Sequence, residues 1–225
     1  GDVTITDSAD SDASTWQAEY IITDSDNLTE VEIPFEVNFA DTSGNSGETV
    51  NGTTDNSKVI YDNTTPELTD VTLSSNNSND STLAKAGDTV TLEISADETI
   101  MEPVVTIAGI SVTAKNNNND AKSWQADYTL QDSDTEGGIS YSIDYQDLAG
   151  NSGTQYSVSA ENSGVTFDNT PPSGYSVSIE NEKIDKDNKE QMAFTVSNAN
   201  SELNYNYSIE DESGESIENS GSLTS

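Results

Sequence analysis

The sequence predicts an all-β protein built from antiparallel β-sandwiches, and three observations support this fold class. Apolar and polar residues alternate in several segments, for example over residues 89–96 and 139–146, and a period of two marks strands with one buried face. Clusters of Gly, Asn, Asp and Ser separate these segments and are typical of turns. No segment shows the apolar period of about 3.6 residues that an amphipathic helix needs.

Part of the chain is repeated, which indicates more than one folding unit. Residues 124–128 (Trp-Gln-Ala-Asp-Tyr) repeat residues 16–20 (Trp-Gln-Ala-Glu-Tyr) at an offset of 108. Residues 168–170 repeat residues 62–64 (Asp-Asn-Thr) at an offset of 106. Matching segments that survive a change in loop length indicate a duplicated unit. We therefore expect the C-terminal part of a repeat over residues 1–64, a complete repeat over 65–172, and the N-terminal part of a further repeat over 173–225.

The complete repeat is expected to contain seven or eight short strands. In chain order they cover residues 68–74, 89–96, 104–108, 110–114, 124–130, 139–146, 155–160 and 164–168. In the final part, Tyr175–Ile179, Met192–Val196 and Tyr205–Ile209 alternate in the same way. Many short strands with turns between them favour tandem immunoglobulin-like antiparallel β-sandwiches.

The composition excludes several classes of function. Seven basic residues stand against 42 acidic ones, for a net charge of -35. Such a chain repels nucleic acid and attracts divalent cations. No apolar run reaches the length of about 18 residues that membrane insertion needs. The chain has no His and no Cys, so it can build neither a Ser-His pair nor a thiol nucleophile. We expect it not to be an enzyme.

A family resemblance rests on several short motifs taken together. They are residues 62–66 (Asp-Asn-Thr-Thr-Pro), 83–90 (Leu-Ala-Lys-Ala-Gly-Asp-Thr-Val), 147–151 (Asp-Leu-Ala-Gly-Asn) and 168–172 (Asp-Asn-Thr-Pro-Pro). The chain resembles the bacterial and archaeal Ig-like tandem repeats of large cell-surface proteins, which include repeat adhesins and Ig-rich surface-layer proteins. This resemblance implies an extracellular location at the cell surface. It also implies structural work, neighbouring repeats or copies of the same chain as partners, and calcium at the domain junctions.

Two groups of residues are candidate calcium ligands. Carboxylate and amide oxygens are the ligands that calcium prefers. The junction group comprises Asp62, Asn63, Asp168 and Asn169; the loop group comprises Asp132, Asp134 and Glu136, with Asp24 and Asp26 in the first copy. Each group has a structural alternative, because Asp-Asn-Thr-Pro is also turn chemistry and an acidic hairpin loop is also a solvated turn.

Two further motifs favour a structural interpretation. Asp147 and Asn151 bracket a Gly-Asn turn, which recurs at Asp41 and Asn45. Trp16 and Trp124 each begin an alternating strand, and we expect both to pack in a sandwich core.

The sequence therefore predicts a non-catalytic structural protein that forms part of a surface layer or an adhesin stalk and is stabilised by calcium. Two alternatives remain open at this stage. The chain is a glycan- or peptide-binding adhesion module, or it forms accessory domains of a secreted enzyme.

Overall fold

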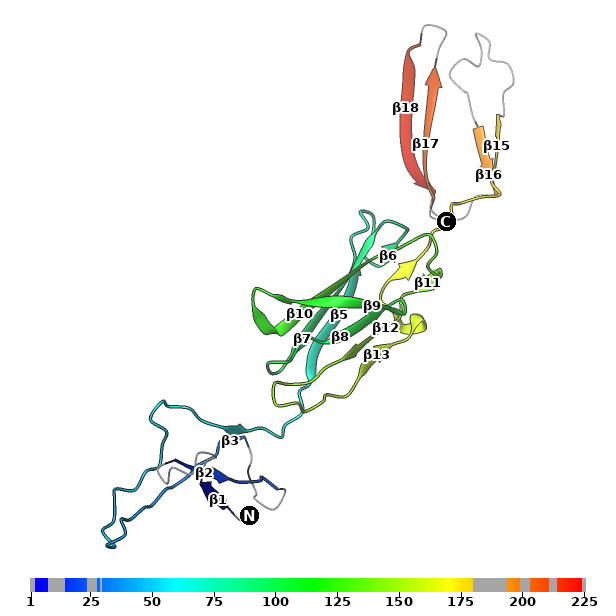
Figure 1. Cartoon of the computed structure of the whole chain (residues 1–225). Helices are drawn as coiled ribbons and strands as arrows, with labels where there is room; N and C mark the ends of the chain where they lie inside the picture. Colours follow the sequence, from blue (N-terminus) through cyan, green and yellow to red (C-terminus); the bar gives the residue numbers. More distant parts are fainter. Residues whose placement is uncertain are drawn as a thin grey trace. The chain divides into compact units, whose positions relative to one another are not determined.

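The computed structural model describes residues 3–7, 15–23, 28, 30–179, 194–198, 203–210 and 214–223. The chain divides into two compact units, Gly1–Phe167 and Asp168–Ser225. In the described residues the regular structure consists of β-strands and a 3-10 turn, η2 (Ala160–Asn162) (Figure 1). The prediction of an all-β fold is confirmed, and the expected division into three parts stays a prediction.

Most of the first unit is a β-sandwich formed by residues 66–167. Its main sheet has seven strands in the order β13-β12-β8-β9-β10-β7-β5, and every neighbouring pair is antiparallel. Their bounds are β5 (Leu68–Ser75), β7 (Thr89–Ala96), β8 (Val104–Ile107), β9 (Ile110–Asn117), β10 (Asp120–Thr129), β12 (Tyr141–Asp144) and β13 (Tyr156–Val158). Strand β9 pairs with both β8 and β10, so the two halves of one curled sheet form the two layers.

A second, three-stranded sheet lies beside this one. It contains β6 (Leu83–Ala84), β11 (Gly137–Gly138) and β14 (Thr166–Phe167). Strand β14 pairs antiparallel with β11 and parallel with β6. Since β6 follows the far end of β5, the chain enters the sandwich at one end, near Leu68, and leaves it at the other, near Phe167.

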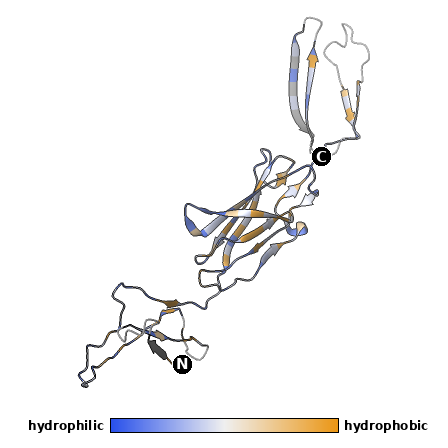
Figure 2. Cartoon of the chain, in the orientation of Figure 1, coloured by the Kyte–Doolittle hydropathy of each residue, from blue (hydrophilic) through white to orange (hydrophobic). Residues whose placement is uncertain are grey.

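The alternating residues of both layers form the core. Val90, Leu92 and Ile94 of β7 are buried, as are Val105 of β8 and Ile143 of β12. Each such side chain contributes about 1.5–3 kcal/mol through burial. Apolar residues accordingly mark the strands of this sandwich in Figure 2.

The segment before the sandwich repeats its hydrogen-bonding register. Strands β3 (Val31–Glu32) and β4 (Ile60–Tyr61) pair as Val31↔Tyr61 and Glu32↔Ile60. At an offset of 106 these pairs become Gly137↔Phe167 and Gly138↔Thr166, which are the pairs of β11 with β14. The bridges Val37↔Val50 and Ala40↔Ser46 likewise recur as Ile143↔Tyr156 and Gln146↔Ser152. Residues 31–61 and 137–167 thus share one pattern of strand pairing.

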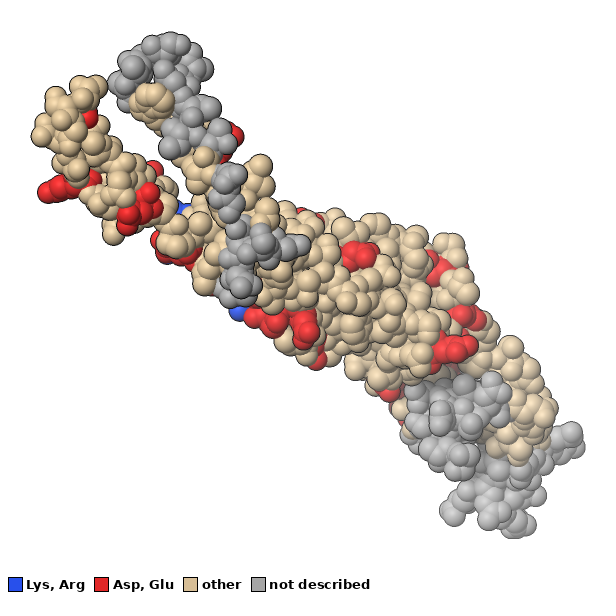
Figure 3. Space-filling view, turned by 90° about the horizontal axis from the view of Figure 1, so that it is seen from below, with Lys and Arg blue, Asp and Glu red and all other residues tan. Residues whose placement is uncertain are grey.

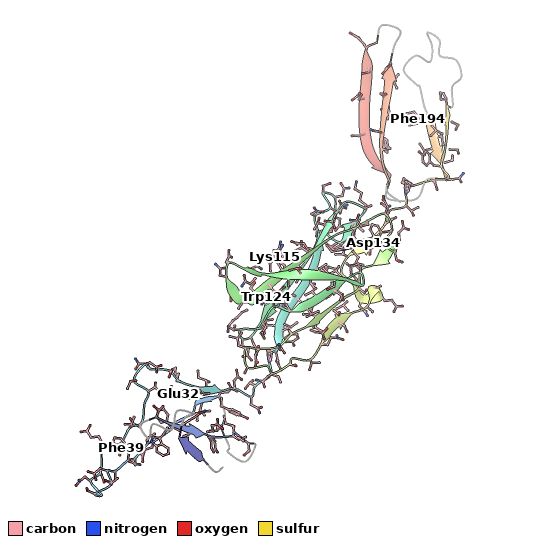
Figure 4. All side chains as sticks on the ribbon, viewed as in Figure 1. Glu32, Phe39, Lys115, Trp124, Asp134 and Phe194 are labelled. Carbon is pink, nitrogen blue, oxygen red and sulfur yellow. The ribbon has the colours of Figure 1, made fainter. Side chains whose placement is uncertain are left out.

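The two tryptophans nevertheless differ in burial. Trp124 of β10 is 7% exposed, and its Nε1 donates to the carbonyl oxygen of Ala121 at 3.0 Å; Figure 4 places it within the sandwich. Trp16 of β2 (Trp16–Glu19) is 61% exposed, so the expectation that it packs in a core is wrong. Among the described residues β2 pairs with β1 (Thr4–Asp7) alone, whereas β10 lies between β9 and β7.

The second unit contains two hairpins. The first pairs β15 (Ser176–Ile179) with β16 (Phe194–Ser197), and the second pairs β17 (Leu203–Glu210) with β18 (Ser216–Leu223). The rings of Phe194 and Tyr207 meet edge to face, with centroids 5.2 Å apart. The expected strands around Phe194 and Tyr207 are confirmed, while Met192 lies outside the described residues.

Candidate functional site

Three carboxylates converge at the end of the sandwich where the chain enters. Asp62 directly follows β4, Glu98 follows β7, and Asp147 lies in the loop after β12. One oxygen from each lies within 4.8 Å of the others. We call these residues the carboxylate cluster. It joins the segment before the sandwich to two loops of the sandwich itself.

The position of Asp147 is fixed by a tight turn. Its Oδ1 accepts hydrogen bonds from the backbone N–H groups of Gly150 at 2.7 Å and Asn151 at 2.8 Å. Its Oδ2 accepts one from Nδ2 of Asn151 at 2.7 Å. Gly150 adopts φ +97°, which glycine reaches without strain. The turn interpretation of this motif is therefore confirmed, and Asp41 accepts the same side-chain bond from Asn45 at 2.7 Å.

Asp147 is 1% exposed and is still held in its charged form. Burial raises its pKa, but the hydrogen bonds from the side chain and backbone of Asn151 and the backbone of Gly150 outweigh burial and lower it. These bonds favour the carboxylate over the neutral acid. The cluster thus contains a buried negative charge at neutral pH.

The pKa of Glu98 is shifted in the opposite direction, upward. Its burial raises its pKa, and the charges of Asp62 and Asp147 raise it further, with smaller effects from Asp97 and Glu30. Like charges at this separation disfavour ionisation. The cluster is therefore a site of electrostatic repulsion that a bound divalent cation would relieve.

Hydrogen bonds also hold residues 62–64, which lead into the sandwich, next to the carboxylate cluster. Nδ2 of Asn151 donates to the carbonyl oxygen of Asp62 at 3.2 Å. Glu30 accepts from the Thr64 hydroxyl at 2.6 Å and from the backbone N–H of Asn63 at 3.0 Å. The hydrogen bonds from Thr64 and Asn63 lower the pKa of Glu30. The junction is thus built from residues on both of its sides.

The predicted ligands fall into separate places. Asp62 belongs to the cluster, whereas the backbone of Asn63 donates to Glu30. Asp168, the counterpart of Asp62 one repeat later, accepts from the backbone N–H of Thr170 at 3.0 Å, as in a turn. Asn169 is half-buried. The two pairs belong to two successive junctions, and their role as calcium ligands stays a prediction.

The acidic loop between β10 and β11 is organised around Asp134. Its carboxylate accepts from the Tyr128 hydroxyl at 3.0 Å and from the backbone N–H of Gln131 at 2.8 Å. Asp132 and Glu136 do not join it in a three-carboxylate group within the described residues. Asp24 and Asp26 of the first copy lie outside the described residues.

Sequence reasoning missed Glu98 as a candidate ligand and assigned Asp147 to turn formation alone. One signal was present, because Asp62 and Asp147 both belong to motifs that recur at the offset of 106. Their convergence with Glu98 depends on which strand ends share one end of the sandwich, and this comes from the fold.

The cluster suits a hard divalent cation. Calcium takes about six to eight oxygen ligands, and three carboxylates supply up to about six. Acidic side chains also spread over the surface seen in Figure 3, where few lysines are visible. That background attracts cations to the whole chain without selecting a site.

Comparison with known proteins leaves the family open. The chain matches no protein-family model, no curated protein and no solved structure.

In the described residues no helix combines the length and hydropathy of a membrane span.

Proposed function

We propose that this chain is a non-catalytic structural segment of a cell-surface protein, in which tandem immunoglobulin-like units are held together at calcium-binding junctions. The repeated register of residues 31–61 and 137–167 supports the tandem arrangement. The strand order of the sandwich formed by residues 66–167 supports the immunoglobulin-like interpretation. Strands β5-β7-β10-β9 and β8-β12-β13 follow the ABED and CFG orders of that fold.

The observation that carries the calcium proposal is the carboxylate cluster itself. Asp62 belongs to the segment that precedes the sandwich, while Glu98 and Asp147 belong to the sandwich. A cation held by all three would connect two successive units and neutralise their mutual repulsion. It would thereby limit bending at the junction in an array whose work is to set distance and stiffness.

Two versions of the structural role differ in their neighbours. A surface-layer lattice predicts lateral contacts between chains, and an adhesin stalk predicts units joined only end to end. Electron microscopy of the native cell envelope distinguishes them. Saturable binding on a glycan array would favour the alternative, a glycan-binding module, and would count against a purely structural role.

The calcium proposal is tested by thermal unfolding of the full chain with calcium and with a chelator. A ligand at a hundredfold excess over its Kd stabilises by about 2.7 kcal/mol, which raises the Tm of a unit of this size by roughly 10 °C. Glu98→Gln should abolish most of this gain. Asp132→Asn is the matched control, because it removes an acidic loop residue outside the cluster, and it should keep the gain. Equal melting with calcium and with chelator would contradict the proposal.

A further inference from the structure

The backbone of Glu30 adopts a conformation that is uncommon for its residue type. Its φ is +43°, in the left-handed region that glycine, asparagine and aspartate visit more readily than glutamate. Such a conformation persists where the surrounding contacts fix the residue. Glu30 lies directly before β3, and its contacts lie in the junction.

Strand pairing brings Glu30 to the segment that leads into the sandwich. The antiparallel register of β3 with β4, continued by one residue, pairs Glu30 with Asp62. Oε1 of Glu30 accepts three hydrogen bonds, from the Thr64 hydroxyl at 2.6 Å and from the backbone N–H groups of Asn63 at 3.0 Å and Thr64 at 3.1 Å. One carboxylate oxygen thus clasps the two residues that follow Asp62.

This clasp fixes the turn in which Asp62 lies. The backbone N–H of Thr64 also donates to Oδ1 of Asp62 at 3.1 Å, so Glu30 and Asp62 share this donor. On the sandwich side, Nδ2 of Asn151 donates to the carbonyl oxygen of Asp62 at 3.2 Å. The turn at Asp62 is therefore held by one residue from each side of the junction, Glu30 and Asn151.

Glu30 itself lies outside the carboxylate cluster. In the described residues, the group whose oxygens lie within 4.8 Å of one another contains Asp62, Glu98 and Asp147. Of the neighbouring charges that raise the pKa of Glu98, that of Glu30 has the smallest effect. This arrangement favours a positioning role for Glu30 over direct ligation.

The residues of the clasp recur together in the next copy of the repeat. At the single offset of 106 the counterparts of Glu30, Asp62, Asn63 and Thr64 are Glu136, Asp168, Asn169 and Thr170. The loop beside them changes in length, because Asp26 lies four residues before Glu30 and Asp134 lies two residues before Glu136. Four residue types that are kept while the neighbouring loop changes favour a shared role over a chance contact.

We propose that Glu30 is a positioning residue of the junction site, whose carboxylate holds residues 62–64 in the turn that directs Asp62 into the carboxylate cluster. The inference rests on the proposed function and deepens it, because it assigns a residue that organises the cation site without touching the cation. Residues that orient metal ligands contribute to metal affinity because the ligands are then in place before the metal binds.

Calcium titration of the full chain by calorimetry tests this role, at high salt to screen the diffuse negative charge. Glu30→Ala removes the acceptor of all three hydrogen bonds and should raise the calcium Kd of the junction about 10–100-fold. Glu30→Gln removes the charge but keeps a side-chain oxygen that can accept the same bonds, so it should retain most of the affinity. Glu48→Ala is the matched control for charge, because it removes one exposed carboxylate of the same segment, and it should leave Kd unchanged.

Hydrogen exchange with a chelator present measures the clasp without the cation. The amide N–H groups of Asn63 and Thr64 should be protected in the unmodified chain and in Glu30→Gln, and should exchange faster in Glu30→Ala. Thermal unfolding of the sandwich in chelator should be the same for all variants, because Glu30 lies outside its core. Equal exchange of these amides in Glu30→Ala and the unmodified chain would overturn the inference.

Failure of the positioning role and failure of the cation site give different results. An unchanged Kd in Glu30→Ala, with calcium bound by the unmodified chain, would overturn the positioning role and leave the proposed function intact. An equal loss of affinity in Glu30→Gln and Glu30→Ala would show that the charge of Glu30 acts on the cation directly, and would also overturn it. Absence of calcium binding by the unmodified chain would overturn the cation site and, with it, the role of Glu30.

Discussion

Replacing Trp124 by alanine tests whether the sandwich core has been assigned correctly. A buried aromatic side chain of this kind covers about 200 Å², which at about 25 cal/mol per Å² corresponds to roughly 5 kcal/mol. Measured Trp→Ala changes in protein cores fall at about 3–5 kcal/mol. Since a domain of this size is stable by only about 5–15 kcal/mol, we expect Trp124→Ala to remove a large fraction of its stability.

Urea unfolding in dilute solution, followed by far-UV circular dichroism, measures this loss. The midpoint of the main transition should fall while its slope stays constant, because the surface exposed on unfolding hardly changes. Trp16→Ala is the matched control and should leave that transition in place, because Trp16 lies outside the core. A loss below about 1 kcal/mol for Trp124→Ala, or equal shifts for the two variants, would refute the reasoning.

Three further predictions concern the loops and the cluster. Asp147→Ala removes the acceptor of three hydrogen bonds at a buried site and should cost about 2–4 kcal/mol in urea unfolding; Asp41→Ala, at the exposed counterpart, should leave the main transition unchanged. Gly138→Ala should lower Tm because its Cβ would collide with the carbonyl oxygen of Ala160, whereas Gly164→Ala, with 3.9 Å to its nearest neighbour, should have little effect; equal melting would contradict the packing at Gly138. Because the folded pKa of Glu98 is raised, the stability that its protonated form contributes is present below the unfolded pKa of about 4.3 and is lost as the pH rises through the folded pKa. Without calcium, Glu98→Gln should therefore raise Tm at neutral pH and not at pH 4. A gain of equal size at both pH values would show that charge repulsion at Glu98 is not the cause.

Strand positions could be predicted where alternation was strong. The range expected for β7, residues 89–96, agrees with Thr89–Ala96, because Val90, Leu92 and Ile94 all point into the core. Strand β6 is only two residues long and leaves no periodic signal. Strand β18 (Ser-Ile-Glu-Asn-Ser-Gly-Ser-Leu) has too few apolar residues to alternate.

In the candidate site, the local turn could be predicted from the sequence, whereas the convergence of the three carboxylates could not. Turn chemistry is local, so the motif of Asp147 and Asn151 indicated its hydrogen bonds in advance. The proximity of Asp62 to Glu98 and Asp147 depends on three segments far apart in the chain. Likewise, Trp16 is exposed because β2 pairs with β1 alone among the described strands, and the pattern of its own strand cannot indicate this.

The opposite positions of entry and exit determine how the sandwich would respond to tension. A pull applied through Pro66 and Asp168 acts along the strands, because β5 starts at one end and the parallel β6–β14 pair lies at the other. Ladder hydrogen bonds run across the strands, so such a load shears many of them together and does not unzip them one by one. A tethered unit should therefore rupture in a single high-force event in pulling experiments.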